Sequence, residues 1–155
     1  MKSLSKEIGK KLKAKKKTLA LAESCTGGYL SHLITSVSGS SAYYKGGIVS
    51  YDNAVKVKIL GVKKKTLQKF GAVSAECAKE MASGILKKLK TDYALATTGI
   101  AGPSGAVKGK PVGTVYIAFA SKKVVLAERF QFKGGRLQVI KQTAQQAVEI
   151  LASNL

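Results

Sequence analysis

Ser24 lies where an apolar segment meets a glycine-rich turn, a place suited to a nucleophilic hydroxyl. Residues 18–22 are predicted to form a buried strand, the turn Ser24-Cys25-Thr26-Gly27-Gly28 follows, and a helical pattern begins behind it. A strand end holds a hydroxyl rigidly, and glycines let a substrate approach the backbone. The N–H groups that open the next helix can stabilise an oxyanion or a phosphate. The alternative is an ordinary strand-to-helix connection capped by Ser or Thr.

Tyr51 and Lys56 supply the other parts of a Ser-Lys hydrolase, namely a phenol that can relay a proton and an amine base. Lys56 falls near the start of a helix that we expect to begin at Asp52. The positive end of the helix dipole disfavours an ammonium ion there, and partial burial in a strongly cationic protein adds to this effect, which favours a neutral base. The alternatives are a packing role for Tyr51 at a strand end and a solvated Lys56.

Regular spacing of apolar residues predicts the elements that position these groups. Leu4, Ile8 and Leu12 recur every four residues, as on an amphipathic helix. Helices are also predicted at 28–37, 53–60, 64–70, 75–89 and 136–151, and strands at 18–22, 46–51, 93–98, 112–120 and 124–132. Asp52 and Ser74 are the expected N-caps of two helices, and Gly61 closes the first of these. On the last helix we expect these residues to face inward: Leu137, Ile140, Ala144, Ala147 and Leu151.

The order of these elements predicts the fold class. Strands alternate with helices, and then a hairpin and a terminal helix follow, which indicates a single three-layer α/β/α domain with a mixed β-sheet over residues 1–155. Loops at the carboxyl ends of strands surround a common crevice in such sheets. The turns at 24–28, 51–56 and 98–105 are therefore expected to meet.

Composition narrows the range of partners. The net charge is +19, nearly all of it from lysine, with Arg129 and Arg136 as the only arginines. Because base and phosphate recognition in nucleic-acid binders relies heavily on arginine, we favour a solvated lysine surface over a dedicated nucleic-acid face. A positive field would nevertheless attract a phosphorylated substrate. No apolar run approaches the roughly 20 residues of a membrane span, so we expect no membrane partner and a cytoplasmic location.

Cysteine and histidine are scarce. Cys25 and Cys77 form no disulfide framework and no metal-ligand spacing, and His32 is the single histidine. A multi-histidine metal site is therefore excluded. His32 follows Ser24 by eight residues on the expected helix, so it should point away from the turn. We expect no metal.

Six ordered motifs between about residue 4 and residue 152 resemble the CinA C-terminal domain family, which includes nicotinamide-nucleotide amidases. The motifs are Glu23-Ser24-Cys25-Thr26-Gly27-Gly28, Gly39-Ser40-Ser41-Ala42-Tyr43, Ser50-Tyr51-Asp52-Asn53-Ala54-Val55-Lys56 with Leu60-Gly61-Val62, Gly71-Ala72-Val73-Ser74, Thr98-Gly99-Ile100-Ala101-Gly102-Pro103 and Lys110-Pro111-Val112-Gly113-Thr114-Val115.

The resemblance implies hydrolysis of the carboxamide of nicotinamide mononucleotide to nicotinic acid mononucleotide and ammonia, in pyridine nucleotide salvage and without a cofactor. By motif, Ser24 would be the nucleophile, and Lys56 assisted by Tyr51 would activate it. Cys25 is a rival nucleophile by its chemistry, but the family pattern gives that role to Ser24. The implied substrate-binding residues are Cys25, Thr26, Gly27, Gly28, Thr98, Gly99 and Arg136, with oxyanion donors either in the 25–27 backbone or at residues 98–99.

One segment departs from the family pattern. The family has Gly-Asp-Arg followed by a second arginine at the start of the last helix, whereas this chain has Gly135 in place of the acid and Ile140 in the second basic position. Arg136 remains as the expected phosphate contact. The departure therefore bears on substrate identity more than on reaction type.

A second function class remains open at this point. A basic domain without catalysis, binding nucleotides or nucleic acid and linked to competence or DNA damage, would account for the charge. It has no reason to assemble Ser24, Tyr51 and Lys56 together. By resemblance we also expect a homo-oligomer and a chain of the stand-alone form.

Overall fold

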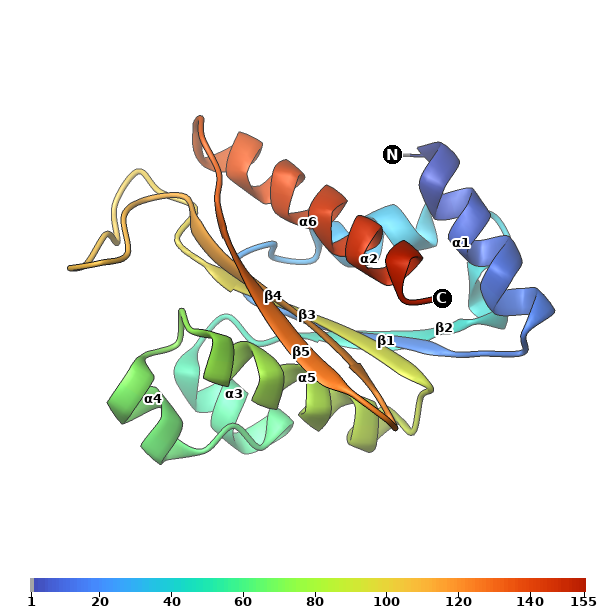
Figure 1. The fold of residues 1–155 in the computed structure, drawn as a ribbon, viewed down its shortest axis with the longest axis horizontal. Coiled ribbons are helices and arrows are strands. Elements are labelled where there is room, and N and C mark those ends of the chain that lie inside the picture. Colours follow the sequence, from blue (N-terminus) through green and yellow to red (C-terminus); the bar gives the residue numbers. More distant parts are fainter. Residues whose placement is uncertain (1) are drawn as a thin grey trace.

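The computed structural model describes residues 2–155 as one α/β domain, in which helices cover both faces of a five-stranded sheet (Figure 1). The elements in chain order are α1 (Lys2–Ala14), β1 (Leu19–Glu23), α2 (Tyr29–Thr35), a 3₁₀ turn (Ser40–Ala42), β2 (Tyr44–Val49), α3 (Asn53–Leu60), α4 (Lys64–Phe70), α5 (Ala75–Leu89), β3 (Tyr93–Gly99), β4 (Thr114–Ser121), β5 (Val125–Gln131) and α6 (Arg136–Ser153).

The sheet is mixed, with strand order β2-β1-β3-β4-β5. β1 runs parallel to β2 and β3, and β4 runs antiparallel to both β3 and β5. In the sheet, β2 lies along one edge of β1 and β3 lies along its other edge, so the direction of the strand order reverses at β1. Ligands bind beyond the carboxyl ends of strands at such a reversal. The end of β1 is Glu23 and the end of β3 is Gly99, so the expected crevice lies between them.

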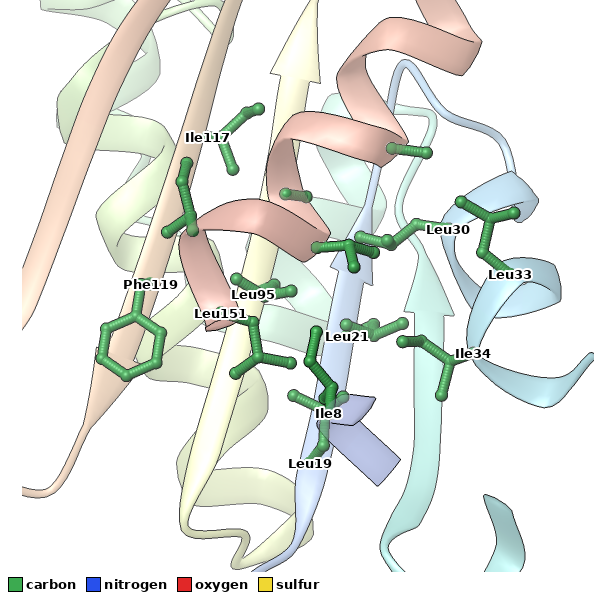
Figure 2. Close-up of a cluster of buried hydrophobic side chains, with 14 of the residues drawn as sticks. Ile8, Leu19, Leu21, Leu30, Leu33, Ile34, Leu95, Ile117, Phe119 and Leu151 are labelled. Carbon is green, nitrogen blue, oxygen red and sulfur yellow. The ribbon is translucent and has the colours of Figure 1, made fainter. Parts of the chain in front are cut away.

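Alternation of large and small residues along the central strands explains the three layers. Successive strand residues point to opposite faces, and Leu21, Leu95 and Phe119 belong to the core under α1, α2 and α6 (Figure 2). The intervening alanines, including Ala20 and Ala94, face α5 instead. Small residues on that face let α5 lie close to the sheet. The predicted architecture is confirmed.

Helix caps fall where the sequence predicts them. The Asp52 carboxylate accepts a hydrogen bond from the Ala54 N–H, and Gly61 ends α3 in the left-handed conformation. The Ser74 hydroxyl accepts from the Cys77 N–H at the start of α5. These caps fix the ends of the two helices that flank the crevice.

Several predictions about local structure are wrong. Helix α2 ends at Thr35 rather than at residue 37, and strand β4 begins at Thr114 rather than at residue 112. Leu137 is 69% exposed rather than inward-facing, and Val139 is the first buried residue of α6. Strand β2 ends at Val49 rather than at residue 51. Tyr51 therefore lies outside the sheet and is 60% exposed.

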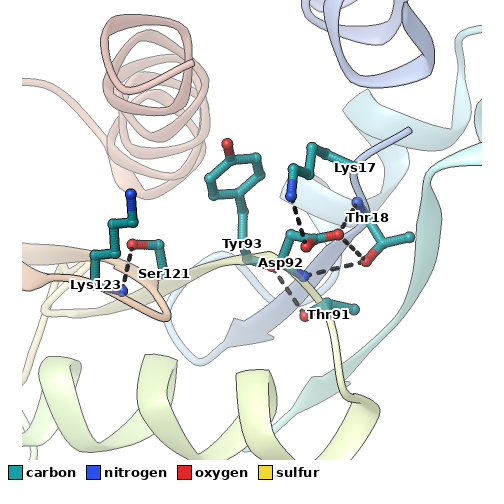
Figure 3. A network of polar contacts seen from close by, with 7 residues as sticks. All are labelled: Lys17, Thr18, Thr91, Asp92, Tyr93, Ser121 and Lys123. Carbon is teal, nitrogen blue, oxygen red and sulfur yellow. Dashed lines mark hydrogen bonds and ion pairs between the residues drawn. The ribbon is translucent and has the colours of Figure 1, made fainter. Parts of the chain in front are cut away.

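At the opposite end of the parallel strands, Asp92 ties the start of β3 to the start of β1. Its carboxylate accepts from the Thr18 N–H at 2.9 Å and from the Thr18 hydroxyl at 3.0 Å, and it pairs with Lys17 at 3.2 Å (Figure 3). These bonds hold the starts of the two neighbouring parallel strands together. Within residues 2–155, no helix is both long enough and apolar enough to cross a bilayer.

Candidate active site

A cavity of about 260 Å³ lies at the carboxyl ends of β1 and β3. Seven residues singled out from the sequence line it, and five of these lie outside β3: Ser24, Cys25, Tyr51, Lys56 and Arg136. Asn53, Ser104 and the loop before α5 also contribute to the lining. Thr98 and Gly99 complete the wall from β3. A larger groove of about 820 Å³ lies between α3 and α5, but lysines and small residues dominate its lining and it holds no nucleophile paired with a base.

Ser24 and Lys56 meet in this cavity. The Lys56 Nζ lies 3.0 Å from the Ser24 Oγ, although the two residues are 32 positions apart in the chain. Lys56 is 1% exposed and Ser24 is 8% exposed. The amine also lies 2.6 Å from the Ser50 carbonyl oxygen and 3.4 Å from the Tyr51 carbonyl oxygen.

The hydrogen-bond partners of the Lys56 amine determine where the lone pair of its neutral form would point. Carbonyl oxygens only accept hydrogen bonds, so the Ser50 and Tyr51 carbonyls take up two N–H groups of the amine. The third partner, the Ser24 hydroxyl, accepts from the Lys56 amine in the protonated form and, unlike a carbonyl oxygen, also has a proton to give. Burial lowers the pKa of Lys56 below its ordinary value of 10.5, although the neighbouring Cys77, Cys25 and Asp52 side chains oppose this shift. A neutral Lys56 in this position can accept the Ser24 proton.

Local structure positions Lys56 beside Ser24. After β2, the Ser50 N–H donates to the Glu23 carbonyl at 2.7 Å, which joins the strand end to the residue before Ser24. Asp52 then caps α3, and the Lys56 N–H donates to the Asp52 carbonyl in the first turn. Lys56 and Leu60, one turn apart, form the buried side of this short helix.

The turn after β1 is organised by Glu23, a residue that the sequence analysis did not single out. Its carboxylate is 1% exposed and accepts from the backbone N–H groups of Leu30 at 2.9 Å and Ser31 at 3.0 Å. The opening of α2 is therefore already occupied by a carboxylate. The expectation that these N–H groups are free to receive an oxyanion or a phosphate is corrected. The sequence did contain one signal of this role, because Glu23 is a single acidic residue at the end of an otherwise apolar strand.

Thr26, Gly27 and Gly28 lie in the turn but outside the lining of the cavity. The Thr26 hydroxyl is bonded to Glu23 and to Thr97, and the Gly27 N–H donates to the Ser24 carbonyl at 3.0 Å. Gly27 and Gly28 both have positive φ, which glycine adopts without strain. These residues shape the turn, and their contact with a substrate stays a prediction.

Thr98 and Gly99 form the wall opposite Ser24. The Thr98 hydroxyl donates to the Ala72 carbonyl at 2.8 Å and so fixes the loop before α5. The Ile100 N–H donates to Thr114 of β4. Since N–H groups alternate in direction along a strand, the Gly99 N–H points the other way, toward β1 and the Ser24 turn. Gly99 is therefore the better placed of the two β3 candidates for an oxyanion donor.

Arg136 connects two sides of the cavity rim. One guanidinium nitrogen donates to the Gly102 carbonyl at 2.7 Å, and the other donates to the Tyr51 phenol oxygen at 2.7 Å. In residues 2–155 no hydrogen bond joins the Tyr51 phenol to Ser24 or Lys56. The part of Tyr51 that contacts Lys56 is its carbonyl oxygen, which is backbone.

Cys25 is a poor rival for the role of nucleophile. Burial raises the pKa of its thiol to about 12, and the thiolate is the reactive form. His32 is exposed on α2, away from the cavity lining. No group of three or more histidine, cysteine or acidic side chains in the described part of the chain could hold a metal ion.

Sequence comparisons match the whole chain to one family. The CinA C-terminal domain family matches residues 1–155. A CinA-like protein of Amoebophilus asiaticus is 49% identical over 153 residues, which cover 99% of this chain and 37% of that protein. A CinA-like protein of Endomicrobium trichonymphae is 48% identical over 153 residues, or 99% of this chain and 36% of that protein. The chain thus spans about a third of the length of these relatives.

Solved structures agree over the whole domain. The competence/damage inducible protein CihA of Agrobacterium tumefaciens superposes with a TM-score of 0.95 at 37% identity, covering 98% of this chain and 93% of that chain. A competence-damaged protein (CinA) superfamily protein of Escherichia coli gives a TM-score of 0.96 at 32% identity, covering 99% and 90% of the two chains.

Proposed function

Because this chain belongs to the CinA C-terminal domain family, we propose that it is an amidohydrolase that converts nicotinamide mononucleotide to nicotinic acid mononucleotide and ammonia. The observation that carries the proposal is the Ser24–Lys56 pair, with an Nζ to Oγ distance of 3.0 Å in a buried position on the cavity wall. A domain that only binds nucleotides gains nothing from a buried lysine held against a serine hydroxyl.

The proposed reaction begins with attack by the Ser24 Oγ on the carboxamide carbon, while the Lys56 amine takes the hydroxyl proton. The Gly99 N–H and the backbone of the Ser24 turn stabilise the oxyanion that forms. Lys56 then gives its proton to the leaving nitrogen, ammonia departs, and an ester remains on Ser24. Water attacks that ester while Lys56 accepts the water proton. Lys56 then returns this proton to the Ser24 Oγ as its bond to the acyl carbon breaks, which releases the acid and restores the hydroxyl and the neutral amine.

Arg136 and Tyr51 take the parts of the substrate away from the amide. Arg136 lines the cavity and retains guanidinium N–H groups beyond the two that are bonded to Gly102 and Tyr51, so it can approach a phosphate. The Tyr51 phenol accepts from Arg136 and so holds that guanidinium at the cavity rim. The proton relay that the family resemblance implies for Tyr51 is the alternative, and Tyr51→Phe distinguishes the two. The net charge of +19 would raise the local concentration of a phosphorylated substrate.

The test is release of ammonia from nicotinamide mononucleotide by purified protein, compared with Ser24→Ala. We expect release by the wild type and none above the blank by Ser24→Ala. Full activity in Ser24→Ala would remove Ser24 from the mechanism. If the wild type matches the no-enzyme blank and instead shifts DNA in a salt-sensitive manner, the basic binding domain is the better interpretation.

A further inference from the structure

We infer that Glu23 is a positioning residue, whose side chain and carbonyl hold Ser24 and Lys56 in one fixed geometry. The inference rests on the proposed use of Ser24 as a nucleophile, because a fixed geometry matters only if the hydroxyl reacts. Nothing in the sequence motif distinguishes this role from that of an ordinary acidic residue in a turn.

The Glu23 side chain holds the turn that carries Ser24, residues 24–28, in place. Besides the Leu30 and Ser31 N–H groups, its carboxylate accepts from the Gly28 N–H at 3.2 Å, from the Thr26 hydroxyl at 2.6 Å and from the Ser31 hydroxyl at 2.5 Å. All five groups are donors, so the carboxylate is used purely as an acceptor. It sits where the partial positive charge of a helix start favours an anion.

Two hydroxyl groups that bond to this carboxylate are themselves hydrogen-bonded to residues of the strands on either side of β1. The Thr26 hydroxyl lies 2.8 Å from the Thr97 hydroxyl of β3, and the Tyr44 phenol of β2 donates to the Ser31 hydroxyl at 2.8 Å. Since Thr26 gives its proton to Glu23, it must accept from Thr97. The carboxylate is therefore tied to the strands on both sides of β1, which is why the turn cannot shift independently of the sheet.

The backbone of Glu23 is connected to Lys56, the proposed base, through Ser50. Its carbonyl oxygen accepts from the Ser50 N–H at 2.7 Å and from the Ser50 hydroxyl at 3.2 Å. The Ser50 carbonyl in turn accepts from Lys56 at 2.6 Å. One residue thus contacts the scaffold of both partners in the Ser24–Lys56 pair. Misplacement of reacting groups by about 1 Å can cost about 100-fold in rate.

The same arrangement assigns the substrate anion to the other side of the cavity. A phosphate at the α2 N-terminus would have to displace a buried carboxylate bonded by five donors. Arg136 remains the cation on the opposite rim. Loss of the Glu23 charge should therefore affect turnover while leaving affinity for the phosphorylated product unchanged.

The experiment compares wild type with Glu23→Gln, which keeps the side-chain shape and removes the charge. Each protein is assayed for ammonia release, for binding of nicotinic acid mononucleotide, and for the rate at which a fluorophosphonate modifies Ser24 with loss of fluoride. We expect kcat and the labelling rate to fall together by about 10- to 100-fold, with KM and product binding within about twofold.

Matched controls separate positioning from general stability. Ile34→Val and Ile34→Ala remove packing from the same helix at a residue that is 1% exposed and outside the cavity lining, and they should lower the melting temperature without slowing labelling while folded. Ser31→Ala removes one hydroxyl donor to the carboxylate. It should slow labelling in the same direction by a smaller factor, and it serves if Glu23→Gln does not fold.

Each outcome decides something. The inference is overturned if folded Glu23→Gln has a labelling rate and a kcat within twofold of wild type. It is also overturned if an Ile34 variant with the same melting temperature as Glu23→Gln loses as much of its labelling rate and kcat. Failure of the fluorophosphonate to modify wild-type Ser24 would also overturn it. If wild type is labelled, Glu23→Gln is labelled more slowly and neither releases ammonia, Glu23 keeps its role and the proposed substrate is wrong.

Discussion

The Arg136 guanidinium donates to the Tyr51 phenol oxygen at 2.7 Å, which joins the first residue of α6 to the loop after β2 across 85 positions of sequence. A second bond to the Gly102 carbonyl makes Arg136 the connection between three segments of the cavity rim. Arg136 thus lies at the rim of the cavity, whereas Ser24 and Lys56 lie at its buried wall, and the proposed function gives binding to the first and chemistry to the other two.

Arg136→Ala is expected to weaken substrate binding. A hydrogen bond to a charged group contributes about 1.5–3 kcal/mol, so KM should rise by about 10- to 100-fold with a smaller effect on kcat. Steady-state kinetics on nicotinamide mononucleotide measure this change. Lys10→Ala, on the outer face of α1, is the control. An equal rise of KM in both variants would remove Arg136 from phosphate binding.

Tyr51→Phe separates two roles of the phenol. If the hydroxyl acts by holding Arg136, its loss should raise KM and leave kcat nearly unchanged, because the Tyr51 carbonyl still contacts Lys56. If the phenol relays protons, kcat should fall instead. We expect the change in KM, since the phenol bonds to Arg136 in this structure. Kinetic constants of the single variant decide between the two.

Activity should rise with pH as Lys56 loses its proton. Only the neutral amine can take the Ser24 proton, and burial lowers the pKa of Lys56, so the rising limb of kcat/KM should lie below the ordinary lysine value of 10.5. The exposed Lys58, two residues along the same helix, provides the control. Lys58→Ala should leave the limb in place, and Lys56→Ala should abolish it together with activity.

Cys25 is expected to be dispensable for chemistry. Because burial raises the pKa of its thiol to about 12, almost no thiolate is present at neutral pH, and alkylation by iodoacetamide should be slow. Cys25→Ala should keep kcat within a few fold of wild type. A loss of activity in Cys25→Ala comparable to that in Ser24→Ala would return Cys25 to the list of nucleophiles.

Gly99→Ala should destabilise the domain. A Cβ on Gly99 would lie 2.6 Å from the Val115 Cγ2 and 2.9 Å from the Thr114 carbonyl oxygen, both on β4. Overpacking of this kind typically costs about 1–3 kcal/mol. Chemical denaturation measures the loss. Gly61→Ala serves as comparison, because its Cβ would meet no atom within 4 Å and the cost there comes from positive φ alone.

The sequence alone was enough to predict the three layers and the capped ends of α3 and α5, because these depend on residues that are close together in the chain. Alternating leucine and alanine in β1 places large side chains on one face and small ones on the other. Asp52, Gly61 and Ser74 act within a few residues of their own positions. The inward face of α6 was harder to predict, since Leu137 has the correct spacing but is 69% exposed in the first turn of the helix.

Sequence could also nominate Ser24, Lys56 and Arg136 by residue type and motif, but only the tertiary structure decided what each contacts. The 3.0 Å approach of Lys56 to Ser24 depends on the parallel pairing of β1 with β2 and on the cap of α3. The Tyr51 phenol meets Arg136 across 85 positions of sequence, and the Thr26 hydroxyl that bonds to Glu23 meets Thr97 across 71 positions. Such contacts join residues far apart in the chain, so spacing along the sequence contains no record of them.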